Sequence, residues 1–193
     1  MATAALKTSG TTDTRQRIIE VAVRLFTRHS FAGTSLQMIA DEMGFTKAAV
    51  YHHFHTREEL LAAVVEPVFI QVRATIEQAE AKRSPGARAE HMLTGYADVA
   101  VRHRALIAVL AGDPGVVEML QDDFGDLITR QIKLLADVDP GPAGLVKAAV
   151  VLAGIAGAAL PSRQLNVDDD DLRQHFIEIG RRTLGLRAPR VAG

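Results

Sequence analysis

The chain has 193 residues, of which 48% are hydrophobic and 23% are charged, and its formal net charge is -1. This length and composition can bury a sizeable core, which excludes a disordered chain and a protein that coats nucleic acid by bulk charge alone. The absence of cysteine excludes disulfides, cysteine-ligated metal sites and thiol nucleophiles.

Charge is distributed unevenly along the chain. Residues 1–57 contain seven Lys or Arg against four Asp or Glu, whereas the rest contains 15 against 19. A mildly basic N-terminal part therefore precedes an acidic one. Residues 1–14 lack the apolar run of a signal peptide, and the most apolar stretch, 148–160, is shorter than the roughly 20 residues that cross a bilayer. We therefore expect a cytoplasmic protein with no membrane partner.

Apolar residues recur at helical spacing throughout, which predicts an all-α fold. A disordered arm is expected at residues 1–13, followed by a first helix with Thr12 or Asp13 as its cap. One face of this helix carries Ile18, Ala22, Leu25, Phe26 and His29.

Residues 34–57, TSLQMIADEMGFTKAAVYHHFHTR, predict two short helices joined by a turn. Thr34 is expected to cap the first helix in a capping box with Gln37, and Gly44 to end it. Thr46 is expected to cap the second. The residues predicted to point inward are Leu36, Ile39, Ala40, Met43, Val50 and Phe54.

The outward side of the second short helix suits a nucleic-acid groove. Lys47 can reach phosphates or guanine edges, and the methyl groups of Ala48 and Ala49 can pack on thymine methyls. Thr34 and Tyr51 offer hydroxyls to phosphate oxygens. Gln37 could contact a base edge or serve only in the capping box.

Residues 56–59 form a second capping box, which predicts a fourth helix from there. Pro67 interrupts its pattern and predicts a kink and a candidate hinge. Further helices are expected at about 87–102, 104–111, 115–135 with a break near Gln121, 142–160 and 169–184. The apolar face of the fourth helix comprises Leu60, Leu61, Val64, Val65, Val68, Phe69, Val72 and Ile76.

Three linked blocks, GTSLQMIA, GFTKAAVYHHF and REELL, resemble the N-terminal signature of the tetracycline-repressor-type (TetR) family of transcriptional regulators. The resemblance covers about residues 14–62. It implies a three-helix bundle with a helix-turn-helix at residues 14–60 and a larger helical ligand-binding and dimerisation domain at 61–193.

The resemblance also implies roles for single positions. Thr34, Ser35, Tyr51 and His52 match positions that contact DNA phosphates, and Gln37 matches one that can reach a base. Arg57 matches the cation at the start of the fourth helix and is expected to bind DNA, and Phe54 matches a buried anchor. The groove-facing start of the recognition helix corresponds to Thr46, Lys47, Ala48 and Ala49.

The last two expected helices are candidates for a homodimer interface. The run 148–160 is apolar on nearly every side, which predicts burial all round. With Leu172, Phe176, Ile179 and Leu184 it could form half of a four-helix dimer contact, where the resemblance also places one. A monomer core remains the alternative.

A cavity for a largely apolar small molecule is implied by the resemblance, and plain core packing is the alternative for each candidate residue. The candidates are Met92, Tyr96, Val99, His103, Ile107, Phe124, Leu127 and Ile128.

The leading hypothesis is a homodimeric repressor that a small molecule releases from a palindromic operator in double-stranded DNA, with no cofactor and no enzymatic activity. The sequence has no phosphate-binding glycine loop, nucleophile elbow or paired metal-ligand motif. Adjacent histidines at 52, 53 and 55 point in different directions on a helix, which disfavours a metal site. An all-helical enzyme and a protein-docking module are the competing classes.

Overall fold

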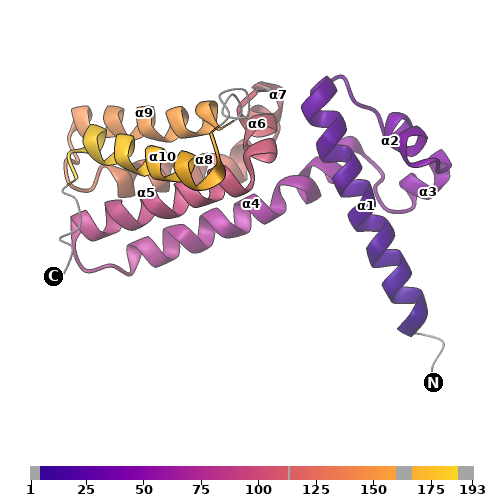
Figure 1. Ribbon diagram of the computed structural model, residues 1–193. Helices are drawn as coiled ribbons and strands as arrows, with labels where there is room; N and C mark the ends of the chain where they lie inside the picture. The colour runs from indigo at the N-terminus through magenta and orange to yellow at the C-terminus, as the bar shows by residue number, and fades with distance from the viewer. Residues whose placement is uncertain (1–4, 113, 160–166, 187–193) are drawn as a thin grey trace. The chain divides into compact units, whose positions relative to one another are not determined.

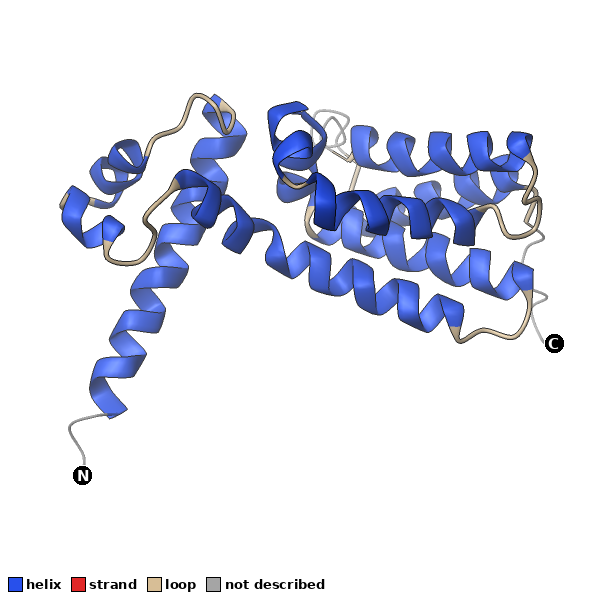
Figure 2. Cartoon of the chain, turned by 180° about the vertical axis from the view of Figure 1, so that it is seen from behind, coloured by secondary structure: helices blue, strands red, loops and turns tan. Residues whose placement is uncertain are grey.

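The computed structural model describes residues 5–112, 114–159 and 167–186. Within these ranges every regular element is an α-helix, which confirms the predicted all-α class (Figures 1 and 2). The chain divides into two compact units, Met1–Pro67 and Val68–Gly193. The boundary expected from sequence, at 60/61, lies earlier, because the first turns of α4 pack with the first unit.

The first unit contains α1 (Ala5–His29), α2 (Leu36–Met43), α3 (Lys47–Tyr51) and the start of α4 (Arg57–Glu80). Helix α1 begins earlier than expected, so residues 5–13 are helical where the sequence predicted a disordered arm. Ala5, Leu6 and Lys7 are strong helix formers, which favours this extension. Residues 1–4 of the predicted arm lie outside the described residues.

The predicted buried face of α1 is present, with Ile18 and Ala22 fully buried and Leu25 and Phe26 nearly so. His29 is the exception: it is exposed, because it is the last residue of α1 and the helix ends there. The Phe26 ring makes an edge contact with Phe31, at 5.4 Å between centroids, which closes the core beneath the following turn.

In the described residues, the second unit contains the rest of α4 and six further helices. The predicted break near Gln121 is present at Leu120, between α7 and α8. Helix α4 is helical through Pro67, and all eight residues of its predicted apolar face are buried. The remaining bounds are α5 (Pro85–Arg102), α6 (Arg104–Gly112), α7 (Pro114–Met119), α8 (Gln121–Leu135), α9 (Pro142–Ala158) and α10 (Asp169–Leu184).

Helix α5 lies against α8 and α10, and α9 lies against α6, α8 and α10 (Figure 1). The contact of α5 with α10 buries Leu93, which lies beside Gly180, and is bridged at its edge by an ion pair between Arg181 and Glu90. None of the helices in the described ranges combines the length and apolarity that crossing a bilayer requires.

Helix α9 differs from the prediction of burial on all sides, and only part of the predicted apolar face of α10 is exposed. In α9 one face is buried within the unit, whereas Val146 and Val150 are 63% and 59% exposed. In α10, Ile179 is 60% exposed, but Leu172, Phe176 and Leu184 belong to the core of the unit, because α10 packs on α5 with that face. Residue 160, at the end of the predicted run, lies outside the described residues.

The approach of α4 to α5 at Gly95 generates a stability prediction. A Cβ on Gly95 would lie 2.4 Å from Cγ2 of Thr75, so Gly95→Ala should lower the free energy of unfolding by about 1–3 kcal/mol. Adding Thr75→Ser, which removes that Cγ2, should restore part of the loss. Denaturant unfolding measures both effects.

Gly125→Ala is the matched control, because a Cβ added at this position of α8 would have nothing within 4 Å. It should stabilise the protein by roughly 0.5–1 kcal/mol through helix propensity alone. Equal responses of the two glycine variants would contradict the steric argument.

Candidate functional site

Local capping defines the helix-turn-helix formed by α2 and α3. Ser35 is the N-cap of α2 and its Oγ accepts a hydrogen bond from the Met38 amide at 3.1 Å. Gly44 ends α2 with φ at 66°, as predicted, and Thr46 caps α3 by accepting from the Ala49 amide at 3.3 Å. The turn between the helices is therefore fixed by Gly44 and the Thr46 cap, and the start of α2 by the Ser35 cap.

The predicted capping box at the start of α2 was wrong in both members. Thr34 precedes the N-cap, is only 1% exposed, and donates from Oγ1 to the Ser30 carbonyl at 2.8 Å. Gln37 donates to Asp41 at 2.7 Å rather than reaching back. The hydroxyl of Thr34 is therefore occupied within the protein, whereas Ser35 is half-buried and Gln37 is exposed.

Helix α3 is anchored in the core by Val50 and by Phe54, which follows the helix, and its other side chains are exposed or half-buried. Val50 and Phe54 are fully buried, as predicted. Lys47 and Tyr51 lie together on the opposite side, with the lysine Nζ 5.2 Å from the centre of the phenol ring. The exposed positions of this segment are Thr46, Lys47, Ala48, Tyr51 and His52, and Ala49 is half-buried.

Two cations of α1 lie beside this helix-turn-helix and were not among the predicted site residues. The Arg15 guanidinium lies 4.8 Å from the centre of the Phe54 ring, and that of Arg17 lies 5.6 Å from the Phe45 ring. The basic composition of residues 1–57 was their only sequence signal, since both precede the helix-turn-helix by many residues.

The histidines that follow α3 pack against each other. The rings of His52 and His53 meet edge to face at 5.3 Å. Burial, followed by the nearby His52 and Arg15, lowers the pKa of His53 from its usual value, which favours its neutral form. In the described part of the chain, no three His, Cys, Asp or Glu side chains gather in a way that could hold a metal ion.

Arg57 fixes the turn that leads into α2. Its Nη1 donates to the carbonyls of Phe31, Ala32 and Thr34 at 3.3, 3.2 and 3.1 Å, and its guanidinium lies 5.0 Å from the Phe31 ring. The residue was predicted as a DNA contact. Its hydrogen bonds position the N-terminus of α2 relative to α4.

This arrangement predicts the behaviour of Arg57 variants. Arg57→Ala removes a charged donor from three carbonyls, of which that of Phe31 keeps the Thr34 amide, and should lower the free energy of unfolding by about 2–3 kcal/mol. Arg57→Lys should recover only part of the loss, because an ammonium lacks the planar fork. Denaturant unfolding measures both. Unchanged stability combined with lost DNA binding would instead identify Arg57 as a direct contact.

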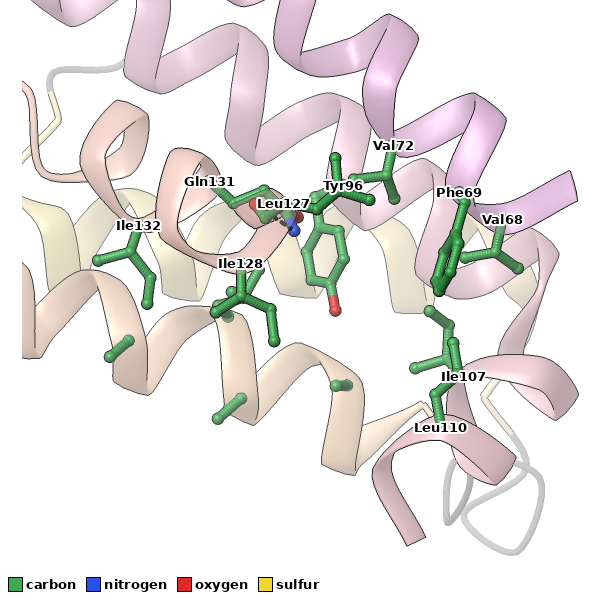
Figure 3. A pocket seen from close by; sticks show the side chains of 14 residues that line it. Val68, Phe69, Val72, Tyr96, Ile107, Leu110, Leu127, Ile128, Gln131 and Ile132 are labelled. Atoms are coloured by element: carbon green, nitrogen blue, oxygen red, sulfur yellow. Dashed lines mark hydrogen bonds between the residues drawn. The ribbon is translucent and has the colours of Figure 1, made fainter. Parts of the chain in front are cut away.

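The second unit encloses a cavity of about 360 Å³ between α4, α5, α6, α8 and α9 (Figure 3). Twelve of its fourteen lining side chains are apolar, and the two exceptions are Tyr96 and Gln131. The alanines that α9 contributes to the lining have small side chains, which leave room for the cavity. The apolar lining consists of Val68, Phe69, Val72, Ile107, Leu110, Leu127, Ile128, Ile132, Ala149, Leu152, Ala153 and Ala156.

Four of the predicted ligand residues line this cavity: Tyr96, Ile107, Leu127 and Ile128. The sequence missed Gln131 and the α9 wall, because their contribution depends on how α8 and α9 pack. The side chain of Phe124 lies outside the described residues.

Three other candidates lie elsewhere. Met92 is fully buried in the core, and Val99 borders a separate polar groove between α4, α5 and α10. His103 ends α5, and its Nε2 is buried without a hydrogen-bond partner among the described residues. The predicted stripe from 92 to 103 spans about 16 Å of helix, which is too long for all of it to face one small cavity.

Comparison with known proteins relates the first unit to one group by sequence and most of the chain to it by fold. Residues 18–64 match the family model of bacterial regulatory proteins, tetR family. The HTH-type transcriptional regulator AcrR of Shigella flexneri is 41% identical over 54 residues, which are 28% of this chain and 25% of that protein. The HTH-type transcriptional repressor NicS of Pseudomonas putida is 27% identical over 103 residues, which are 51% of this chain and 47% of that protein.

Similarity to a solved structure extends over most of the chain. The crystal structure of a TetR-family transcriptional regulator from Bordetella parapertussis aligns with 86% of this chain and 93% of its own, with a TM-score of 0.68 and 18% identity. The curated relatives are matched over less than half of their length, so they bear mainly on the helix-turn-helix unit. All three proteins are named as transcriptional regulators, not as enzymes. Residues 18–64 therefore match the tetR family of bacterial regulatory proteins in sequence, and the fold of the chain is similar to that of a TetR-family regulator.

Proposed function

We propose that this protein is a sequence-specific DNA-binding transcriptional regulator with α3 as its recognition helix. The observation that carries the proposal is the exposed face of α3, where Lys47 and Tyr51 flank the small side chains of Ala48 and Ala49. Small residues let the helix backbone approach the floor of a major groove, and the flanking groups can reach its edges and phosphates.

The DNA contacts proposed for single residues follow from which side chains are exposed. Lys47 is assigned to a guanine edge or a phosphate, and Ala48 and Ala49 to thymine methyl groups. Tyr51 and His52 are assigned to phosphates. Thr46, Ser35 and Gln37 lie at the N-termini of α3 and α2, where backbone amides also favour anions. Thr34 and Arg57 are assigned supporting roles, because their polar groups bind within the protein.

We further propose that the regulator acts as a homodimer on a palindromic operator. One helix-turn-helix makes few base contacts, whereas a two-fold pair contacts half-sites about 34 Å apart. The exposed apolar residues Leu145, Val146 and Val150 of α9 and Ile179 of α10 provide a surface that a second copy can cover. This surface replaces the buried Leu172, Phe176 and Leu184 as the proposed contact.

A small molecule in the α4–α9 cavity is proposed to release the repressor from DNA. The cavity has the apolar lining typical of ligand sites. A ligand that binds more tightly to the conformation that does not fit the operator shifts the population toward that conformation. Each 1.4 kcal/mol of difference between its binding free energies for the two conformations changes their population ratio about tenfold. The NicS relative is named a repressor, which favours repression over activation for this chain.

The DNA proposal predicts a specific effect of Lys47→Ala. A duplex selected from a randomised pool by the wild-type protein should be bound about tenfold more weakly by the variant, with a smaller salt dependence. Tyr51→Ala should weaken binding as well. Electrophoretic titration at several salt concentrations measures these changes.

Lys82→Ala is the matched control, since it removes one exposed lysine from the second unit. It should leave affinity for the selected duplex almost unchanged. Equal losses for Lys47→Ala and Lys82→Ala would show binding by bulk charge, and failure to select any duplex would favour the protein-docking alternative.

The dimer proposal predicts that Val146→Glu or Val150→Glu yields a monomer, because two carboxylates would be buried against an apolar surface. Analytical ultracentrifugation should show a dimer for the wild type and for Val138→Glu, a control at a 39% exposed residue in the turn after α8. A dimer that survives both α9 substitutions would place the interface elsewhere.

A further inference from the structure

The two polar groups of the α4–α9 cavity differ from the rest of its lining and restrict what can bind there. Gln131 is 3% exposed and lies in α8, and Tyr96 extends from α5 with its hydroxyl directed into the cavity (Figure 3). No charged side chain lines the cavity among the described residues.

Only one of the two polar groups of the Gln131 side-chain amide has a hydrogen-bond partner among the described residues. Its Nε2 donates to the Leu127 carbonyl at 3.2 Å, whereas its Oε1 is buried and has no partner among the described residues. The orientation of the amide is fixed by this bond, since only the NH₂ group can donate to a carbonyl. The unsatisfied atom is therefore an acceptor, and a buried acceptor without a donor costs stability that a ligand can recover.

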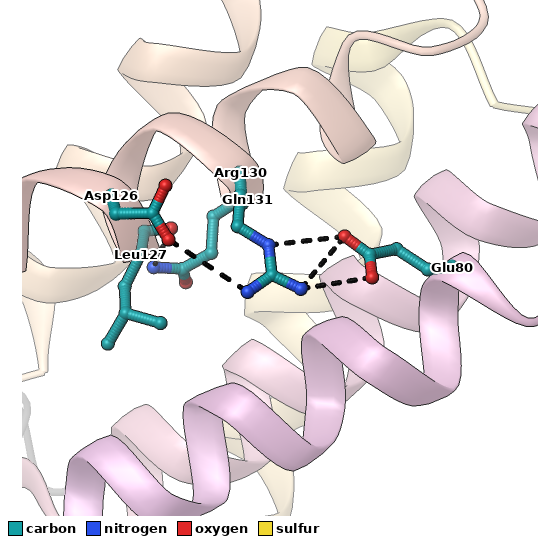
Figure 4. A network of polar contacts seen from close by, with 5 residues as sticks. All are labelled: Glu80, Asp126, Leu127, Arg130 and Gln131. Carbon is teal, nitrogen blue, oxygen red and sulfur yellow. Dashed lines mark hydrogen bonds and ion pairs between the residues drawn. The ribbon is translucent and has the colours of Figure 1, made fainter.

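The neighbouring Arg130 fixes the helix that carries this acceptor. Its Nη2 donates to both carboxylate oxygens of Glu80 at 3.0 Å, and Asp126 lies 3.9 Å from its Nη1 (Figure 4). Glu80 ends α4, the helix that supplies Val68, Phe69 and Val72 to the cavity. Gln131 therefore lies on a helix tied to the opposite wall, which favours a preformed acceptor over a freely moving one.

The lining also disfavours a charged ligand group. A carboxylate or ammonium placed among these side chains would lose its hydration and find no counterion. Burial raises the pKa of Tyr96 well above its usual range, so its hydroxyl stays protonated and neutral and can donate or accept.

We propose that the cavity binds an uncharged, mainly hydrocarbon molecule that carries a hydroxyl group, and that this hydroxyl donates to Oε1 of Gln131. Tyr96 is the second polar partner for the same molecule. This inference rests on the proposed function only in making the cavity a ligand site, because it concerns binding in the absence of DNA.

Four probes of similar size test the chemistry by isothermal titration calorimetry on the full-length protein: 4-hexylphenol, 4-hexylanisole, hexylbenzene and 4-hexylbenzoate. The phenol donates and accepts, the anisole only accepts, hexylbenzene does neither, and the benzoate is charged. The phenol should bind about tenfold tighter than the anisole, as expected for one hydrogen bond to a buried acceptor, and at least tenfold tighter than the benzoate.

Variants locate the interaction. Gln131→Leu should reduce the affinity for 4-hexylphenol to that of 4-hexylanisole and leave the anisole affinity unchanged. Tyr96→Phe should weaken phenol binding by a smaller factor. Gln78→Leu, at an exposed glutamine of α4, is the matched control and should change neither affinity.

Several results would overturn the proposal. Equal affinities for the phenol and the anisole, tighter binding of the benzoate, or no binding of any probe each exclude the proposed ligand class. A phenol preference that survives Gln131→Leu would place the hydroxyl elsewhere. Because no DNA is present, these outcomes are distinct from failure of the operator titration, which tests the regulator itself.

Discussion

The shortness of α3 is the constraint on which the proposed DNA surface depends. Five residues make little more than one helical turn, and so short a helix is unstable by itself because few backbone hydrogen bonds offset the cost of nucleation. The cap at Thr46 and burial of Val50 and Phe54 supply the missing stabilisation. Lys47 and Tyr51 can project outward only because these inward residues hold the turn in one orientation.

Short-range chemistry made this region predictable from sequence. Gly44 and Thr46 act on residues within one turn of themselves, so their roles follow from residue type and spacing. The wrong prediction of Thr34 as the N-cap of α2 also arises from reasoning on residue type and spacing. Thr34 and Ser35 are both good N-caps, and only the bond from Thr34 to the Ser30 carbonyl decides that the helix begins after Ser35.

Long-range packing explains what sequence could not predict. Arg57 reaches carbonyls more than twenty positions earlier in the chain, so its structural role is invisible to local patterns. Gln131 looks like any polar position of an amphipathic helix until α9 supplies alanines opposite it. Of the four candidates along α5, only Tyr96 lines the cavity, next to the space that those alanines leave.

The chain contains two tyrosines and no tryptophan, and the two tyrosines lie in the two proposed sites. Tyr51 is 38% exposed on α3, whereas Tyr96 is 7% exposed at the cavity. Near-ultraviolet absorption and intrinsic emission of the unlabelled protein therefore arise largely from these two rings. Replacing either one by phenylalanine leaves a single tyrosine, so occupancy of the groove-facing helix and of the cavity can be followed optically without attaching a dye.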